Sequence, residues 1–115
     1  MTDVVTNLTK MLDLLGPNGE HWGQGSMHRS DGGIETYCLV GARNIVVFGT
    51  IYRSFRAAYA HTPETEALMR TVKRFYPDKV AADAAKNCTG LTVFNDTSEF
   101  SAIQYVILAT IEAQK

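Results

Sequence analysis

The first segment of the chain has the apolar spacing of an amphipathic helix. Apolar residues recur at helical intervals between residues 2 and 15, with polar residues on the opposite side. These apolar residues are Val4, Val5, Leu8, Met11, Leu12 and Leu15. Thr2 or Asp3 can cap the start, and Gly16 followed by Pro17 favours the end, because proline cannot continue the helical hydrogen-bond ladder. We therefore predict a helix over residues 2–15.

A glycine-rich stretch follows, in which the helical period is lost. Asp31, Gly32 and Gly33 form a tight-turn signal between two short extended runs. The run after this turn contains β-branched and aromatic residues, which favour a strand. The pattern predicts a β-hairpin that pairs residues 22–28 with residues 34–39.

The next segment is ambiguous between strand and helix. Its β-branched residues favour a strand by propensity, but its apolar spacing fits one buried face of a helix. The residues on this face are Leu39, Ala42, Val46, Ile51 and Phe55. The spacing predicts a helix with a break near Gly49, and it places Arg43 at the edge of the buried face.

The second half of the chain contains one well-marked helix start. Thr62 can cap it, Pro63 suits the first helical position, and acidic residues follow in the first turn. We predict a helix to about Tyr76, where Pro77 ends it. Arg70, Lys73 and Arg74 lie toward its carboxyl end and are interpreted as a solvated surface.

The last segment divides into an extended run and a helix. We expect a short helix over residues 78–86, an extended run over residues 90–94 and a final helix from Phe100. The stripe of the final helix consists of Phe100, Ile103, Val106, Ile107, Thr110 and Ile111. Residues 95–99 are rich in capping side chains, which predicts that Asn95 and Asp96 cap this helix.

These elements predict an α+β domain that is predominantly α. We expect three to five helices around one core, with a small β-hairpin after the first helix and one domain over residues 1–115. The predicted core contains Leu8, Leu12, Leu39, Leu68, Val72, Ile103 and Ile107. With 45% hydrophobic and 20% charged residues, the chain has enough apolar surface to fold.

The net charge and the lack of targeting signals limit the classes of partner and the cellular location that we expect. A net charge of -1 provides no global field for a nucleic acid or an anionic membrane, so the expected partner is a protein. The amino-terminal segment lacks the basic start and apolar run of a signal peptide, and no run is long enough to span a membrane. We therefore expect a cytoplasmic protein, and a homo-oligomer is compatible with these features.

Cys38 is the strongest candidate for catalytic chemistry. A thiol at a helix start can be activated, with His21 or His28 as its base and Asn95 or Asp96 orienting that base. The alternative is a small buried hydrophobic residue, which is the commonest state of a free cysteine and the interpretation that we favour. Neither Cys38 nor Cys88 lies in a metal-binding spacing, so we expect no metal and no cofactor.

A second candidate site is a ligand-binding one. Trp22 and Gln24 fall on one side of an extended strand and could recognise a planar ligand, and Asn95 with Asp96 could add polar contacts. Packing of Trp22 in the core and helix capping by the Asn95 and Asp96 pair are the structural alternatives.

The order of these motifs resembles a family of small bacterial and phage proteins of unknown function. The resemblance rests on Trp22 with Gln24, on Cys38 followed by Gly41 and Ala42, and on Phe94-Asn95-Asp96, which all lie between two helices. It implies no settled activity and a frequent occurrence in phage genomes.

From these observations we expect a non-catalytic binding or interaction protein, a phage-related accessory factor that acts on a host macromolecule. The alternative is a small cysteine-dependent hydrolase or transferase that uses Cys38, with His21 and Asp96 as its partners. The lack of a recognisable catalytic signature favours the first hypothesis.

Overall fold

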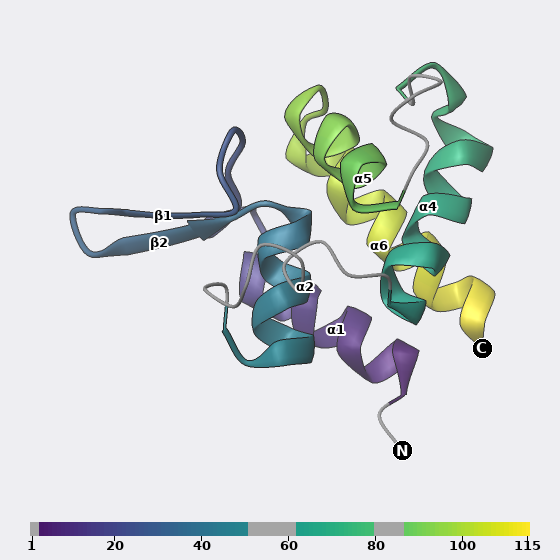
Figure 1. Cartoon of the computed structure of the whole chain (residues 1–115), viewed down its shortest axis with the longest axis horizontal. Coiled ribbons are helices and arrows are strands. Elements are labelled where there is room, and N and C mark those ends of the chain that lie inside the picture. Colours follow the sequence, from purple (N-terminus) through teal and green to yellow (C-terminus); the bar gives the residue numbers. More distant parts are fainter. Residues whose placement is uncertain (1–2, 51–61, 80–86) are drawn as a thin grey trace.

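Helices and one projecting hairpin make up the part of the chain that the computed structural model describes, residues 3–50, 62–79 and 87–115 (Figure 1). In chain order the elements are α1 (Val4–Leu15), β1 (His28–Asp31), β2 (Ile34–Tyr37), α2 (Leu39–Phe48), α4 (Pro63–Phe75), the 3-10 turn η1 (Pro77–Lys79), α5 (Asn87–Asp96) and α6 (Phe100–Gln114). This order confirms the predicted class, α+β with mostly helix and a small hairpin after the first helix.

Several helix ends lie where the capping signals predicted them. The Asp3 side chain accepts a hydrogen bond from the backbone N–H of Val5, and Thr62 accepts one from Thr65. Helix α2 ends at Gly49, which adopts a left-handed conformation with φ 79°. The predicted continuation beyond this break lies outside the described residues. Of the short helix predicted over residues 78–86, residues 78 and 79 belong to the 3-10 turn η1 and the rest lies outside the described residues.

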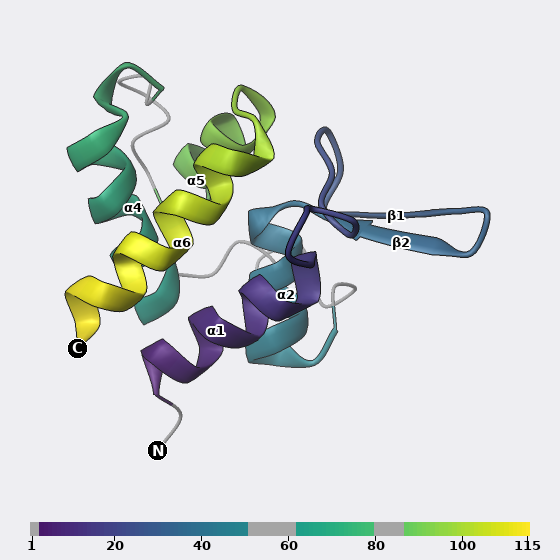
Figure 2. The ribbon, with the colours of Figure 1, turned by 180° about the vertical axis from the view of Figure 1, so that it is seen from behind.

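The helices enclose one apolar core. Helix α1 packs against α2 and α6, α4 packs against α5 and α6, and α2 contacts α5 (Figures 1 and 2). All the predicted core residues are buried except Leu12, for which the prediction is wrong, because it is half-buried at the edge of the core. The buried face of α1 runs through Leu8, Met11 and Leu15, which share one side of the helix. None of the helices within the described ranges is long and apolar enough to cross a membrane.

The hairpin is shorter than predicted. Strand β1 pairs antiparallel with β2 in the register His28 to Tyr37 and Asp31 to Ile34. The prediction that the first strand begins at Trp22 is wrong, since Trp22 makes only an isolated parallel bridge with Tyr37. The residues between Trp22 and β1 turn away instead and contact α5. The hairpin extends away from the helices in both views (Figures 1 and 2).

Two predictions about the last segment are also wrong. The run over residues 90–94 is part of helix α5, not extended, because Leu91, Phe94 and Asn95 share one helical face that is fully buried. Asn95 and Asp96 are the last residues of α5 and do not cap α6. Glu99 precedes α6 and forms no side-chain capping bond. Burial against neighbouring helices outweighs the local preference for an extended run.

Arg43 lies deeper than its sequence position suggested. The side chain is fully buried, not at the edge of the helix face. Its Nε donates to Oδ1 of Asn44 at 2.9 Å, and its Nη1 donates to Oγ1 of Thr65 at 3.1 Å. The bond to Thr65 ties α2 to the first turn of α4, and hydrogen bonds from a charged group are stronger than neutral ones.

Candidate functional site

Asn95 is the centre of a polar junction between residues 22–25, the start of α2 and the end of α5. Its side chain is fully buried. Oδ1 accepts hydrogen bonds from Nε1 of Trp22 at 2.7 Å and from the backbone N–H of Leu39 at 3.1 Å. Nδ2 donates to the backbone oxygen of Gly23 and to Oδ1 of Asp96, both at 3.0 Å. One amide therefore satisfies groups from three separate segments of the chain.

Gln24 extends the polar junction along the end of α5. Its Nε2 donates to the backbone oxygens of Asn95 at 3.1 Å and Ser98 at 2.8 Å. The Asn95 carbonyl is at the end of α5, where carbonyl groups lack intrahelical partners, and the Ser98 carbonyl is in the loop that follows. The Trp22 ring packs against Phe100 with centroids 5.8 Å apart. The polar groups predicted to recognise a planar ligand are thus engaged with the protein itself.

Cys38 forms the third side of the polar junction, as the N-cap of α2. Its Sγ accepts from the backbone N–H of Gly41 at 3.4 Å, and its own N–H donates to the oxygen of Met27 at 3.3 Å. The α-carbon of Gly41 lies so close to this oxygen that an added Cβ would be 1.8 Å from it. A glycine is therefore required where α2 meets the loop before β1.

A small pocket opens beside the polar junction. It has a volume of about 280 Å³ and is lined by Gly25, Ser26, Met27, Cys38, Thr92 and Asp96. The sequence singled out Cys38 and Asp96 as catalytic candidates, and the structure brings both to this pocket. Ser26, Met27 and Thr92 belong to it as well, but they carry no sequence signal that distinguishes them from ordinary loop and helix residues.

The histidines needed for cysteine catalysis are engaged elsewhere. Nδ1 of His21 lies 2.7 Å from the backbone oxygen of Glu35, and Nε2 of His28 lies 2.6 Å from Oε1 of the same residue. Burial raises the pKa of the Cys38 thiol above its ordinary value, and the nearby charge of Asp96 raises it further. An active nucleophile requires the opposite shift.

We therefore expect Cys38 to alkylate slowly in the folded protein. Iodoacetamide should modify it at least about tenfold more slowly than in the urea-unfolded chain at neutral pH, because the thiolate is disfavoured and shielded. The raised pKa means that the rate should keep rising above the pH at which an ordinary thiol is fully ionised. Peptide mass spectrometry would report Cys38 separately from Cys88, and equal rates in the two states would show a reactive thiol.

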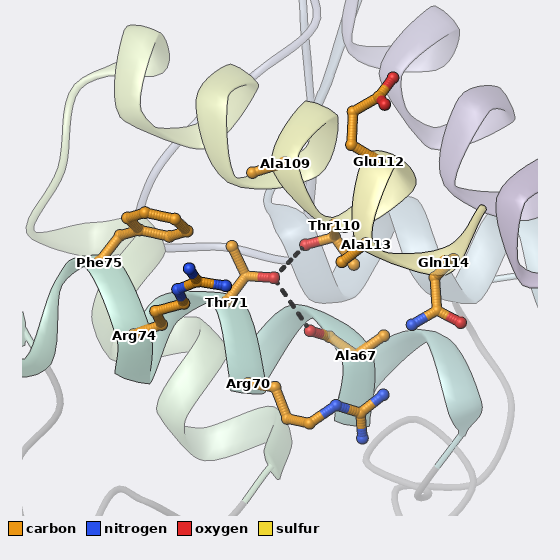
Figure 3. A pocket seen from close by; sticks show the side chains of 10 residues that line it. All are labelled: Ala67, Arg70, Thr71, Arg74, Phe75, Ala109, Thr110, Glu112, Ala113 and Gln114. Atoms are coloured by element: carbon orange, nitrogen blue, oxygen red, sulfur yellow. Dashed lines mark hydrogen bonds between the residues drawn. The ribbon is translucent and has the colours of Figure 1, made fainter.

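A larger hollow lies between α4 and α6, on residues unrelated to the polar junction. This α4–α6 groove has a volume of about 540 Å³ and is lined by Ala67, Arg70, Thr71, Arg74, Phe75, Ala109, Thr110, Glu112, Ala113 and Gln114 (Figure 3). Thr110 donates to the Thr71 hydroxyl at 2.6 Å, which donates to the oxygen of Ala67 at 3.2 Å. These polar groups are satisfied within the protein, so the floor of the groove requires no polar ligand.

The rim of the groove combines two arginines with the exposed ring of Phe75, which contacts Tyr105 outside the groove lining. Arg70 and Arg74 are one helical turn apart on α4, and neither forms an ion pair with a residue in the described ranges. The Arg74 guanidinium lies 5.1 Å from the Phe75 ring, which contacts Tyr105 edge-on at 5.5 Å. Phe75 and Tyr105 are 42% and 47% exposed. The sequence showed the arginines only as a solvated helix end, because the pairing of α4 with α6 is a tertiary contact.

The described residues bring no three His, Cys, Asp or Glu side chains together as metal ligands.

The model of a family of unknown function, DUF6197, matches residues 1–111. The chain belongs to this family. The match includes all of the polar junction and most of the α4–α6 groove. Searches of curated proteins and of solved structures find no match, so function must be argued from the geometry of these two sites.

Proposed function

We propose that the protein is a non-catalytic interaction protein that binds an acidic, amphipathic segment of a protein partner in the α4–α6 groove. The observation that carries this proposal is the α4 side of the groove, where Arg70, Arg74 and Phe75 lie beside small side chains of both helices (Figure 3). Arginine and aromatic residues contribute most of the binding energy in protein interfaces. Leu108 of α6, which is not a lining residue of the groove, is also 47% exposed.

Charge and shape support this class of partner. Arg70 and Arg74, which form no ion pair with the described residues, attract carboxylates, and arginine binds carboxylates with two parallel hydrogen bonds. Alanines at positions 67, 109 and 113 leave room for the apolar side of an incoming helix. Glu112, on the opposite wall, contacts Lys115 at 3.3 Å and so has a cation of its own.

The biological setting is part of the same proposal. We place the protein in the cytoplasm as a phage-related accessory factor whose partner is a host protein. The order of its motifs, which resembles that of small bacterial and phage proteins, supports this setting. The cysteine-hydrolase alternative has less support, because the pKa of Cys38 is raised and neither His21 nor His28 lines the pocket of Cys38.

A binding assay with a defined probe tests the groove. The probe is a short synthetic helix with glutamates on one face and leucines and a phenylalanine on the other, labelled for fluorescence anisotropy. We expect saturable binding that weakens as salt is added, because exposed charges are screened. The double variant Arg70→Glu with Arg74→Glu should weaken binding at least about tenfold.

A charge-matched control variant separates the effect of the groove arginines from the effect of the protein's net charge. The variant Lys10→Glu with Arg29→Glu makes the same change in net charge on exposed residues of α1 and the hairpin. It should bind the probe within about twofold of the parent. Parent-like binding by the groove variant, or an equal loss in the control, would overturn the proposal.

A further inference from the structure

The pocket beside the polar junction is lined by an exposed carboxylate, that of Asp96, which is held in place but forms no ion pair with the described residues. Oδ1 of Asp96 accepts from the backbone N–H of Gly25 and from Nδ2 of Asn95, each at 3.0 Å. Oδ2 of Asp96 has no hydrogen bond to the described residues, and Asp96 forms no ion pair with them. Lys79 donates to the backbone oxygen of Thr97, not to this carboxylate. The free oxygen of Asp96 is thus oriented by bonds to the other one.

The other lining groups of the pocket suit a small cation with an apolar part. Thr92 and Asp96 are one turn apart on α5 and so face the same side. With Ser26 they give the pocket hydroxyl and carboxylate oxygens, whereas Met27 and Cys38 give it an apolar side. A volume of about 280 Å³ lies at the lower end of the range for ligand pockets, which favours a small ligand.

A metal ion fits this pocket less well than an ammonium group. Hard cations take six or more oxygen ligands, and among the lining residues only Asp96 has a carboxylate. No cluster of three metal-ligating side chains occurs among the described residues. An ammonium group needs only hydrogen-bond acceptors for its three protons, which one carboxylate and neighbouring hydroxyls can supply.

We propose that this pocket binds a primary ammonium group on a short alkyl chain, with Asp96 as its counter-ion. The ammonium can belong to a free alkylamine or to a lysine side chain, since both present the same head group and apolar stem. Asn95 acts as a positioning residue, because its Nδ2 fixes the Asp96 carboxylate and its Oδ1 fixes the surrounding backbone. This site lies apart from the α4–α6 groove and shares no lining residue with it.

Nuclear magnetic resonance on the full-length, ¹⁵N-labelled protein tests this site. The probes are n-propylamine, N-acetyl-lysine methylamide and the neutral control 1-propanol. Both amines should shift the amide signal of Gly25 saturably, because this N–H donates to the Asp96 carboxylate. If n-propylamine binds and N-acetyl-lysine methylamide does not, the ligand is a small free amine. If both bind, the pocket also accepts a lysine side chain of a partner. Either result supports the proposal.

Asp96→Asn is the informative variant, because its amide oxygen can still accept from Gly25 while the charge is lost. It should weaken binding of both amines at least about tenfold, while Asp31→Asn on the exposed hairpin should leave it unchanged. If Asp96→Asn fails to fold, Thr92→Val removes a lining hydroxyl and should weaken binding severalfold. The proposal would be overturned if the Gly25 shifts do not saturate or if 1-propanol produces equal shifts. It would also be overturned if a folded variant binds the amines like the parent, or if zinc or magnesium chloride displaces the amines.

Discussion

Gly41→Ala should destabilise the protein by about 3 kcal/mol or more, although alanine is the better helix former. The added Cβ would lie 1.8 Å from the backbone oxygen of Met27 and 2.8 Å from its carbonyl carbon, so the backbone itself must move. Helix propensity favours alanine by only about 1 kcal/mol, which cannot offset such an overlap. Urea denaturation followed by circular dichroism measures the loss.

Gly32→Ala is the matched control for this substitution. Gly32 lies in the hairpin turn with φ 57°, and an added Cβ would meet no atom within 4 Å. Gly32→Ala should therefore lower the free energy of unfolding by only about 1 kcal/mol, because alanine is strained in a left-handed conformation. If Gly41→Ala costs no more than Gly32→Ala, the close approach of α2 to the loop before β1 is wrong.

Asn95→Ala should cost about 3 to 5 kcal/mol of folding free energy. It leaves the Trp22 indole N–H and the Leu39 backbone N–H without their acceptor, and it leaves the oxygen of Gly23 without its donor. Each buried polar group without a partner costs about 1 to 3 kcal/mol. Thermal and urea unfolding measure the loss, and the tryptophan fluorescence of the folded state should shift because Trp22 is the only tryptophan.

Gln104→Ala provides the comparison for Asn95→Ala. Gln104 also donates from its amide to a backbone oxygen, that of Pro17 at 3.3 Å, but this bond is at the surface. Removing it should cost no more than about 0.5 kcal/mol, because water replaces the lost partner. Similar losses for the two amides would contradict the view that Asn95 holds three segments together.

Local signals in the sequence predicted much of the fold. Caps such as Asp3 and Thr62 act on amides two or three residues away, so the residues that form the bond are visible in one short stretch. Helix α5 was missed because its Thr and Val residues favour strands locally. Its helical form depends on burial of Leu91 and Phe94 against distant helices, which no short stretch reveals.

The sequence predicted which residues the polar junction contains, but not what these residues do. Trp22, Gln24, Asn95 and Asp96 were singled out from sequence, and the structure brings them together. That Asn95 bonds Trp22 rather than capping α6 depends on contacts between residues more than seventy positions apart. The α4–α6 groove was not predicted at all, because its walls meet only once the two helices pack.

The most direct test of the α4–α6 groove is a map of backbone amide shifts as the acidic synthetic helix is titrated into the ¹⁵N-labelled protein. The binding proposal predicts that the largest, saturable shifts lie on Arg70, Thr71, Arg74 and Phe75 of α4 and on residues 109–114 of α6 (Figure 3). It also predicts that the Arg70→Glu, Arg74→Glu variant needs at least about tenfold more of the synthetic helix to reach the same shifts. Shifts centred on Gly25, Cys38 and Asp96 instead, or spread evenly over the surface, would contradict it.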